Sequence, residues 1–352
     1  MGLRYFGAIG GLLLSVSIWL GTVSILLGTV SIWLGTVSIL QGTAQAQDHT
    51  DATVTKQGSR RALVSVPQLQ SMLLKQQNVK VVDVGPNREE YDQGHIPGAL
   101  FIHWIYDVID PKEAERYNLI GQSKMQDLLR RLGISENDHI VFYDNISSRL
   151  ATRLYWSLRV YNHQNLHVLD GGRSAWIRQG GALSKEIPKV KPSNYQVGKA
   201  NERMSVDMAF VADHLRDSKV TLIDGRPPEQ FSGEEPGRVF HTGKTHKLLG
   251  HIPGAVHVFW KDNFNEDGTF KSAAELKALY KNAGIQNGEN DTIVTYCNEG
   301  LHAAPPWFVL QELLGVKDVR VYDDSMSEWA NSNQPVEQSI PEKSNPNETA
   351  KQ

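Results

Sequence analysis

Three pairs of matching segments divide this chain of 352 residues into two copies of one domain. GHIPGAL at 94–100 returns as GHIPGAV at 250–256, HIVFYD at 139–144 matches TIVTYC at 292–297, and LDGGRSAW at 169–176 matches YDDSMSEW at 322–329. The matches keep one order, at offsets of 156, 153 and 153 residues. Chance does not produce this arrangement, so we expect a tandem duplication.

Short β-branched runs alternate with helical periodicity in each copy. The runs that indicate buried strands are 79–84, 139–144 and 166–170 in the first copy and 220–224, 291–297 and 319–323 in the second. Helical patterns cover 124–133, 148–161 and 273–284, and another helix is expected after Cys297. Alternating strands and helices predict an α/β fold, with each copy a mostly parallel sheet flanked by helices.

Changes in composition set the domain boundaries. We assign residues 63–183 to the first domain and 204–336 to the second. The stretch 184–203 between them is polar, contains two prolines and is predicted to be a linker. Residues 337–352 have almost no apolar side chains and are predicted to be a disordered tail, because such a segment cannot bury enough surface to fold.

The first 46 residues differ from the rest of the chain. After Arg4 no charged side chain occurs until Asp48, and a seven-residue unit beginning GTVSI repeats three times over 21–41. Ala44 and Ala46 form the small-x-small pattern that signal peptidase accepts. We therefore predict a signal peptide with a duplicated apolar core.

Cleavage after Ala46 would leave a mature chain that begins at Gln47, with 47–62 as an N-terminal linker. The protein would then be exported, to the periplasm or another extracytoplasmic space. The alternative is an uncleaved membrane anchor, because the apolar run is long enough to span a bilayer. Contact with a membrane is expected only if residues 1–46 are retained.

Composition excludes some partners. The chain is 40% hydrophobic and 21% charged with a formal net charge of −3, so it lacks the basic surface that nucleic acids require. Its twelve histidines form no cluster with metal-ligand spacing. We expect no nucleic-acid partner, no metal and no cofactor.

Cys297 is the only cysteine, and it is the last residue of a predicted buried strand. Exported proteins usually pair their cysteines, whereas a single one forms no internal disulfide. A free cysteine is often a small buried apolar residue, which is one interpretation. The other follows from its place at the carboxyl end of a strand before a helix, where ligands bind in α/β sheets.

The loop after Cys297 consists of Asn298, Glu299, Gly300, Leu301 and His302, and a helix from about Ala303 to Leu314 follows. Pro305 and Pro306 suit only a first helical turn. Such a loop can direct backbone N–H groups at the sulfur. We expect these groups to lower the pKa of the thiol and to stabilise a thiolate or a persulfide anion.

On these residues the chain resembles a tandem-domain rhodanese-type sulfurtransferase, of the thiosulfate or 3-mercaptopyruvate kind, over 63–336. The shared motifs are C-x-x-G-x-x-A from Cys297, D-x-R with GHIPGA from Asp224, and D-x-S-x-x-E-W from Asp323. The resemblance implies that Cys297 takes sulfane sulfur from an anionic small-molecule donor and passes it to cyanide or a thiol. The N–H groups of 298–303 would hold the persulfide.

The resemblance also implies two further substrate contacts. Arg226 matches a family arginine that contacts the anionic donor, although an ion pair with Asp224 or Glu229 is the alternative. His95, in the first domain, matches the region from which related enzymes place a histidine near the substrate. The alternative there is that His95 and His251 hydrogen-bond their own turns.

The first copy has Asp144 where the second has Cys297. A carboxylate cannot carry sulfane sulfur, so the first domain is expected to be catalytically inactive. The active loop departs from the family because it carries Asn298 and Glu299 in place of basic or small residues. Glu299 would raise the thiol pKa and repel dianionic donors. Alternatively it points out of the loop, pairs with the basic insert 237–249, or selects a donor that is neutral or cationic.

Two other functions are alternatives to sulfur transfer. A phosphatase of the C-x₅-R type needs an arginine where this chain has Ala303, which argues against that chemistry. A non-catalytic rhodanese-like module that binds an anion or a protein remains the alternative. Glu299 favours it mildly, and the intact cysteine argues against it.

Overall fold

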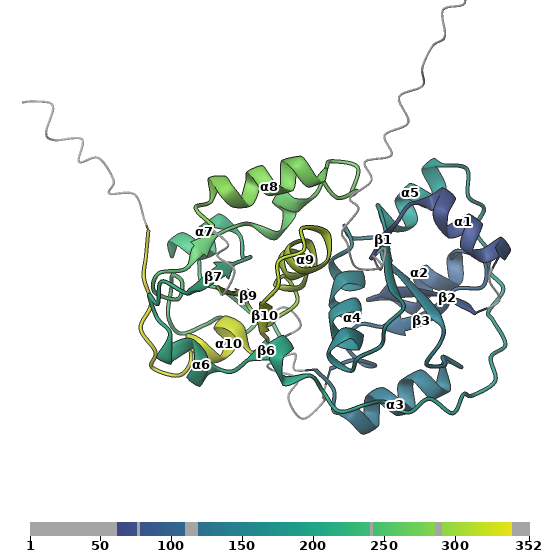
Figure 1. Ribbon diagram of the computed structural model, residues 1–352, viewed down its shortest axis with the longest axis horizontal. Helices are drawn as coiled ribbons and strands as arrows, with labels where there is room; N and C mark the ends of the chain where they lie inside the picture. The colour runs from purple at the N-terminus through teal and green to yellow at the C-terminus, as the bar shows by residue number, and fades with distance from the viewer. Residues whose placement is uncertain (1–61, 76–77, 110–118, 240–241, 286–290, 340–352) are drawn as a thin grey trace, which may run out of the picture. The chain divides into compact units, whose positions relative to one another are not determined.

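The computed structural model describes residues 62–75, 78–109, 119–239, 242–285 and 291–339 (Figure 1). The predicted signal peptide, its cleavage site and nearly all of the N-terminal linker lie outside these residues. Within the described ranges, no helix combines the length and the apolar character needed to cross a bilayer.

The first copy is a five-stranded parallel sheet with helices on both faces. Its strands lie in the order β1-β5-β4-β2-β3, so β4 is central. In chain order the elements are β1 (Leu63–Val64), α1 (Val66–Lys75), β2 (Val79–Gly85), α2 (Arg88–Gln93), β3 (Leu100–His103), α3 (Gln122–Arg131), β4 (His139–Tyr143), α4 (Arg149–Val160), β5 (Leu166–Leu169) and α5 (Gly172–Arg178).

The second copy repeats this topology in the order β6-β10-β9-β7-β8, again with every pair parallel. Its elements are η2 (Glu202–Met204), β6 (Ser205–Val206), α6 (Met208–Asp213), β7 (Val220–Asp224), α7 (Pro228–Ser232), β8 (Val256–His257), η3 (Trp260–Asn263), α8 (Ala273–Asn282), β9 (Thr292–Tyr296), α9 (Ala304–Phe308), η4 (Val309–Leu313), β10 (Val319–Tyr322) and α10 (Ser325–Trp329). The predicted duplication and the α/β class are confirmed.

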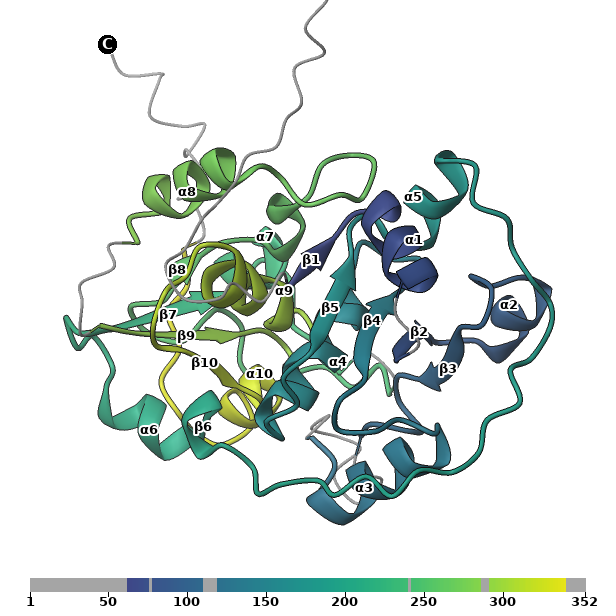
Figure 2. The same cartoon turned by 45° about the vertical axis from the view of Figure 1, so that its right-hand side comes forward.

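Successive residues of the strands face different cores, as the period of two in a strand requires. Val81 and Val141 pack with α1 and α5 on one side of the first sheet, whereas Val82 and Phe142 face α3 and α4 on the other. In the second copy Val294 faces α6 and α10, and Ile293 faces α8 and α9. Helices therefore cover both faces of each sheet, which Figure 2 shows from a second side.

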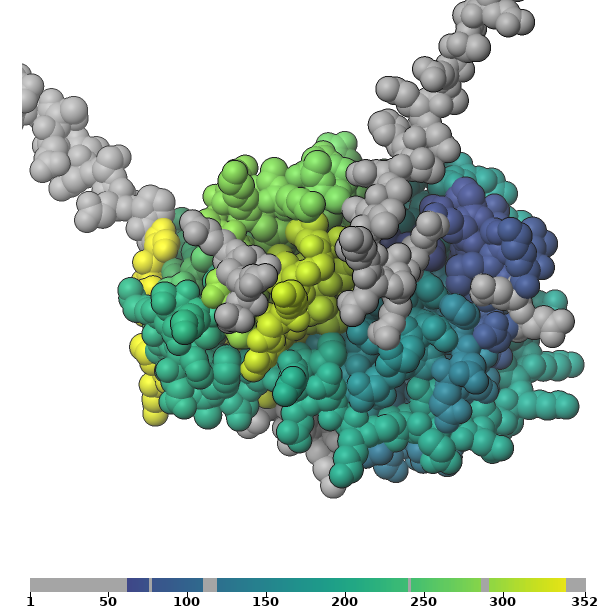
Figure 3. Space-filling model, viewed as in Figure 1, coloured from purple at the N-terminus to yellow at the C-terminus, as the bar shows by residue number. Residues whose placement is uncertain are grey.

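One apolar core is shared by the two copies. It joins the α3–α4 face of the first sheet to the α8–α9 face of the second. Tyr155 on α4 lies edge-on to Phe308 on α9, with ring centroids 4.9 Å apart, and also contacts Trp307. In Figure 3 the second copy, green to yellow, meets the first, purple to teal, along the visible face.

Before η2 the linker after α5 forms no helix or strand, but it packs against the first copy. Tyr195 and Val197 are buried in the shared core, and Asn201 N donates to the carbonyl of Val160 at 2.8 Å. The first residues of the predicted tail, 337–339, contact the second copy. Glu337 exchanges backbone hydrogen bonds with His251 and forms an ion pair with Arg216, and the rest of the tail, 340–352, lies outside the described residues.

Candidate active site

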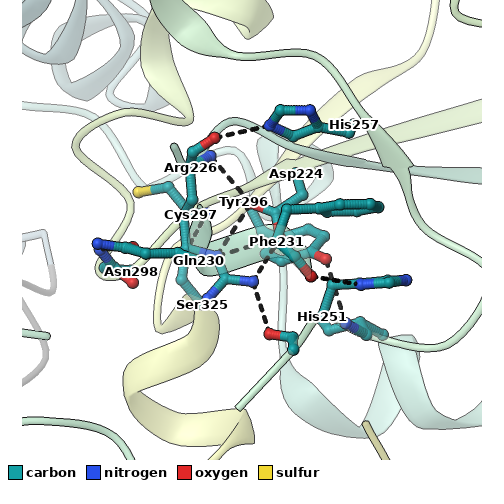
Figure 4. A network of polar contacts seen from close by, with 12 residues as sticks. Asp224, Arg226, Gln230, Phe231, His251, His257, Tyr296, Cys297, Asn298 and Ser325 are labelled. Atoms are coloured by element: carbon teal, nitrogen blue, oxygen red, sulfur yellow. Dashed lines mark hydrogen bonds and ion pairs between the residues drawn. The ribbon is translucent and has the colours of Figure 1, made fainter. Parts of the chain in front are cut away.

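The candidate site lies where the central strand of the second sheet ends. β9 ends at Tyr296, so Cys297 is the first residue beyond it, flanked by β7 and β10. Asp224 pairs in register with Tyr296, which brings the end of β7 to the same edge of the sheet (Figure 4). α9 follows with Pro305 and Pro306 in its first turn, as the sequence predicted.

Backbone amides of the loop point at the sulfur. Sγ of Cys297 accepts hydrogen bonds from the N–H groups of Glu299 at 3.4 Å and His302 at 3.2 Å. The amide of Ala303 also lowers the pKa of the thiol. Inward-facing donors therefore surround the sulfur, and these amides all come from the loop of the second copy.

A second set of hydrogen bonds fixes the base of the loop. Oγ of Ser325 accepts from the amides of Cys297 and Gly300, both at 3.1 Å, and donates to the carbonyl of Tyr322 at 2.7 Å. The amides of Met326 and Ser327, in the first turn of α10, donate to the carbonyls of Cys297 and Asn298. The D-x-S-x-x-E-W motif thus forms the floor on which the loop rests.

Burial changes the acidity expected of the thiol. Cys297 is 0% exposed, and this burial raises its pKa to about 11. The Glu299 amide lowers the pKa, the charge of Glu299 raises it, and the amides of His302 and Ala303 lower it again. The prediction of a lowered pKa is therefore wrong for this conformation, because desolvation outweighs the loop amides.

Glu299 is buried, with an exposed fraction of only 3%, and its charge acts on the thiol. Its carboxylate therefore does not face solvent. The basic side chains Arg238, Lys244 and Lys247 of the insert are exposed, whereas His246 is buried beside the loop. Leu301 and Ala303 enter the shared core and anchor the far end of the loop.

Arg226 is held by Asp224. Its Nε and Nη2 donate to the Asp224 carboxylate at 2.6 to 3.0 Å, and Nη2 also donates to the carbonyl of Gly250 at 2.8 Å. Burial lowers the pKa of the guanidinium, but the Asp224 carboxylate raises it above its ordinary value, and the charge of Cys297 contributes. Arg226 therefore makes the ion pair of the alternative interpretation while lying within electrostatic range of the sulfur.

A polar niche lies beside Asn298. Its Nδ2 donates to Oε1 of Gln230 at 2.9 Å, while its Oδ1 and Nδ1 of His246 are buried without a hydrogen-bond partner among the described residues. A Cβ on Gly237 would lie within 2.6 Å of both atoms, so the niche depends on that glycine. Burial, then the charge of Arg226, lowers the pKa of His246 to about 4, so this ring is neutral.

Both ring nitrogens of His95 contact backbone carbonyls that lie outside the loop of Cys297. Nδ1 lies 2.9 Å from the carbonyl of Tyr91, and Nε2 lies 3.0 Å from the carbonyl of Glu186. The ring is fully buried and stacks on Tyr91. His251 likewise contacts the carbonyl of Phe231 at 2.8 Å. Only the contact with Tyr91 is local, because Glu186 is 91 residues from His95 and Phe231 is 20 residues from His251. Both rings therefore join separate segments of the chain rather than only their own turns.

The first copy contributes two arginines that the sequence reasoning missed. Nη1 of Arg149 donates to Nε2 of His302 at 2.9 Å, and Arg153 forms an ion pair with Asp323. Both lie on α4, four residues apart, in a helix whose other residues are almost all buried. Arginines within a mostly apolar helix were the feature of the sequence that could have pointed to these contacts.

An aromatic and cationic group surrounds His302. Its ring stacks on Trp260 with centroids 5.1 Å apart, and the guanidinium of Arg149 lies 5.5 Å from the Trp260 centroid. Burial, then the charges of Arg149 and Lys261, lowers the pKa of His302 to about 3. His302 is therefore neutral, and the positive charge at this end of the loop comes from Arg149 and Lys261.

The corresponding loop of the first copy encloses a carboxylate. Oδ1 of Asp144 accepts from the amides of Ile146 and Ser148, and Oδ2 accepts from those of Leu150 and Ala151, at 2.7 to 3.0 Å. The loop thus binds its own side chain in place of a sulfur anion. At the position of Arg226 the first copy has Gly85, so it lacks that cation too.

No group of three or more histidine, cysteine or acidic residues within the described ranges is arranged to hold a metal ion. The loop after Cys297 contains one sulfur, backbone amides that point at that sulfur, and buried charged residues nearby. These groups suit nucleophilic chemistry at sulfur.

Comparison with known proteins agrees with this geometry. The family model for the rhodanese-like domain matches residues 65–179 and again residues 207–332. The thiosulfate sulfurtransferase of Corynebacterium glutamicum is 37% identical over 260 residues, which cover 72% of this chain and 82% of that protein. The sulfur carrier protein TtuD of Thermus thermophilus is 35% identical over 261 residues, covering 73% and 90%.

A solved structure resembles the chain as well. SseA from Escherichia coli, described as a 3-mercaptopyruvate sulfotransferase with the rhodanese fold, superposes with a TM-score of 0.65 at 25% identity. The match covers 75% of this chain and 98% of SseA. The structural match therefore includes both copies of the domain and not only the copy with the cysteine.

Proposed function

We propose, because this chain belongs to the rhodanese-like family, that Cys297 carries sulfane sulfur as a persulfide. The chain is a sulfurtransferase, as its relatives are at about 35% identity over most of its length. One observation carries the proposal for Cys297: the amides of Glu299 and His302 converge on Sγ, the only thiol sulfur in the chain.

The first half-reaction forms the persulfide. The Cys297 thiolate attacks the outer sulfur of thiosulfate, a new S–S bond forms, and the old S–S bond breaks with its electron pair leaving on sulfite. With 3-mercaptopyruvate the broken bond is C–S, and the carbon takes the electron pair and a proton to give pyruvate. Cyanide or a thiolate then attacks the outer sulfur of the persulfide, and Cys297 leaves as thiolate.

The raised pKa makes deprotonation part of this reaction. With a thiol pKa of about 11, only roughly one molecule in 10³ to 10⁴ holds a thiolate near neutral pH. A persulfide extends further from the buried Cβ and brings its charge toward the loop amides. We expect the loop to favour the persulfide anion over the thiolate of the resting form.

An anionic donor is supported by cations on two sides of the loop. Arg226, fixed by Asp224, lies within electrostatic range of Sγ, and Arg149 and Lys261 flank His302 at the other end. The relative from Corynebacterium glutamicum is named for thiosulfate, and SseA for 3-mercaptopyruvate. Glu299 opposes a dianion, so we expect weaker use of thiosulfate than the cations alone would give.

Intact mass measurement tests the proposal. The protein is incubated with thiosulfate or 3-mercaptopyruvate, and a gain of one sulfur atom that cyanide removes is the expected result. Cys297→Ser, which removes the only thiol, must show no gain. If no donor adds sulfur to the wild type, the result would favour the alternative, a non-catalytic binding module.

Export is proposed on the composition of residues 1–46. The absence of charge after Arg4 and the small residues Ala44 and Ala46 support a cleaved signal peptide and an extracytoplasmic sulfurtransferase. N-terminal sequencing of the mature protein should begin at Gln47. Recovery of an intact N-terminus in the membrane fraction would favour the anchor instead.

A further inference from the structure

We infer that Arg153, a residue of the inactive first domain, is a positioning residue for the sulfur-carrying loop of the second domain and acts through Asp323. The inference rests on the proposed function of that loop, and it assigns a role to the domain that has no thiol. The contacts identified for Arg153 among the described residues include Asp323 and not the sulfur, so we argue that its effect passes through the floor of the loop.

The link between the domains is a buried, two-pronged ion pair. Nη1 and Nη2 of Arg153 donate to Oδ1 and Oδ2 of Asp323 at 2.5 and 3.1 Å. The Arg153 residue is only 5% exposed, and the Leu119 amide, also from the first domain, donates to Oδ2 at 3.1 Å. A bidentate arginine–carboxylate pair fixes orientation as well as distance.

Asp323 in turn defines where the loop can bend. Gly300 turns the loop with φ at +76°, and a Cβ there would lie 2.2 Å from Oδ1 of Asp323 and 3.0 Å from Nη1 of Arg153. The bend of the loop therefore lies directly against the ion pair. A shift of the Asp323 carboxylate would open space beneath Gly300 and release the bend.

The bend sets the direction of the amides that reach the sulfur. Gly300 lies between Glu299 and His302, whose N–H groups bond Sγ, and its own amide bonds Oγ of Ser325. Asp323 is two residues before Ser325, so one side chain of the first domain braces both the bend and its floor. Misplacement of a reacting group by about 1 Å can slow chemistry roughly 100-fold.

The same helix supplies a matched control. Arg159 on α4 also crosses to the second domain, where its Nε lies 3.2 Å from Oε1 of Glu312 in η4. This pair shares the helix and the domain interface with Arg153. None of its recorded contacts within the described residues involves the loop from Cys297 to Ala303.

The experiment compares Arg153→Met, Arg153→Lys and Arg159→Met in the full chain. Persulfide formation is followed by mass spectrometry in single turnovers over a range of thiosulfate concentrations. Hydrogen exchange is measured on a peptide that covers 297–303. Arg153→Met should lower the limiting rate about 10- to 100-fold with little change in the half-saturating donor concentration, and it should speed exchange of the loop amides.

The conservative and control variants separate positioning from stability. Arg153→Lys keeps the charge but not the fork, so it should recover part of the rate and of the protection. Arg159→Met should retain both near the wild-type values. A normal rate and normal exchange in Arg153→Met would overturn the inference, and so would equal losses in Arg159→Met.

The remaining outcomes also test whether Arg153 positions the loop. If Arg153→Met does not fold, Arg153→Lys decides: slower sulfur uptake with faster loop exchange supports the inference, and wild-type behaviour overturns it. If the wild type takes up no sulfur from any donor, the proposed function fails by itself. The exchange of the loop amides then still shows whether Arg153 positions them.

Discussion

Asp144 and Cys297 occupy the same place in the two copies, directly after the central strand of each sheet and beneath the amides of the loop that follows. Four amides hold the carboxylate in the first copy, and two bond the sulfur in the second. The duplicated loop is thus an anion-binding device in both copies. In the first it is permanently filled by its own side chain.

Replacement of Asp144 by asparagine should destabilise the protein. An amide nitrogen in place of one oxygen would face N–H donors, leaving buried groups unpaired at a cost of about 2–4 kcal/mol. Urea unfolding followed by circular dichroism measures the change. Asp92→Asn, which breaks the exposed Arg88–Asp92 pair, should cost less than about 1 kcal/mol and serves as the control. Equal midpoints for the two variants would contradict the role assigned to the buried carboxylate.

A methyl group at Gly300 should disable sulfur uptake. Gly300 and Gly315 have similar φ values, +76° and +72°, but a Cβ at Gly300 would collide with Asp323, while one at Gly315 would meet nothing within 4 Å. Gly315→Ala should therefore show only the backbone strain, roughly 1 kcal/mol. Gly300→Ala should show additional destabilisation and at least about 10-fold slower persulfide formation. Indistinguishable unfolding curves and rates would argue that the loop relaxes freely.

Removal of the charge of Glu299 should make Cys297 more acidic. The carboxylate raises the pKa of the thiol, so Glu299→Gln should increase the thiolate fraction at a fixed pH. The rate of alkylation by iodoacetamide at pH 8 should rise about 3- to 10-fold, and its dependence on pH should move to lower values. Glu266→Gln, an exposed change in the same domain, is the control. A rate unchanged in Glu299→Gln would mean that its charge is already neutralised.

Asp83 should make the stability depend on mildly acidic pH. Burial raises the pKa of its carboxyl to about 6, from an ordinary value of 3.8, while Tyr143 and Arg173 oppose the rise. The folded state then binds more protons than the unfolded state between pH 4 and 6. The free energy of unfolding should fall as pH rises through that window. Asp83→Asn should weaken this slope in melting temperatures measured at pH 4 to 7, although Asp170, with the same shift, keeps part of it. An unaltered slope would show that Asp83 is not one of the groups responsible.

The sequence predicted the elements that carry a strong local pattern. The strands β2, β4, β7 and β9 are rich in β-branched residues, and α3, α4 and α8 show helical periodicity, so the sequence predicted each within a few residues. The strands β1, β6 and β8 are two residues long, which is too short for any period. They exist because a neighbouring strand offers its hydrogen bonds.

The order of the strand, loop and helix that form the site was predictable from the sequence, but the residues that surround the loop in space were not. The strand, loop and helix around Cys297 follow one another in the chain, so local reasoning located them. Burial of the thiol, which reverses the expected direction of its pKa shift, depends on the shared core. The contacts of Arg149 and Arg153 join residues more than 150 positions apart, and no local pattern reports such pairs.

The apolar core that joins α4 to α9 has a consequence for how the duplicated chain can change over generations. Because Tyr155 and Phe308 pack against each other, loss of the first copy would expose the back of the helix that follows Cys297. A half of the molecule whose loop has no thiol is therefore expected to be kept for its packing on that helix and for the Arg153–Asp323 ion pair, and not for sulfur chemistry of its own. Changes to the face of α4 that touches its twin, or to the buried Asp144 and the loop around it, are the ones that such a chain should tolerate least.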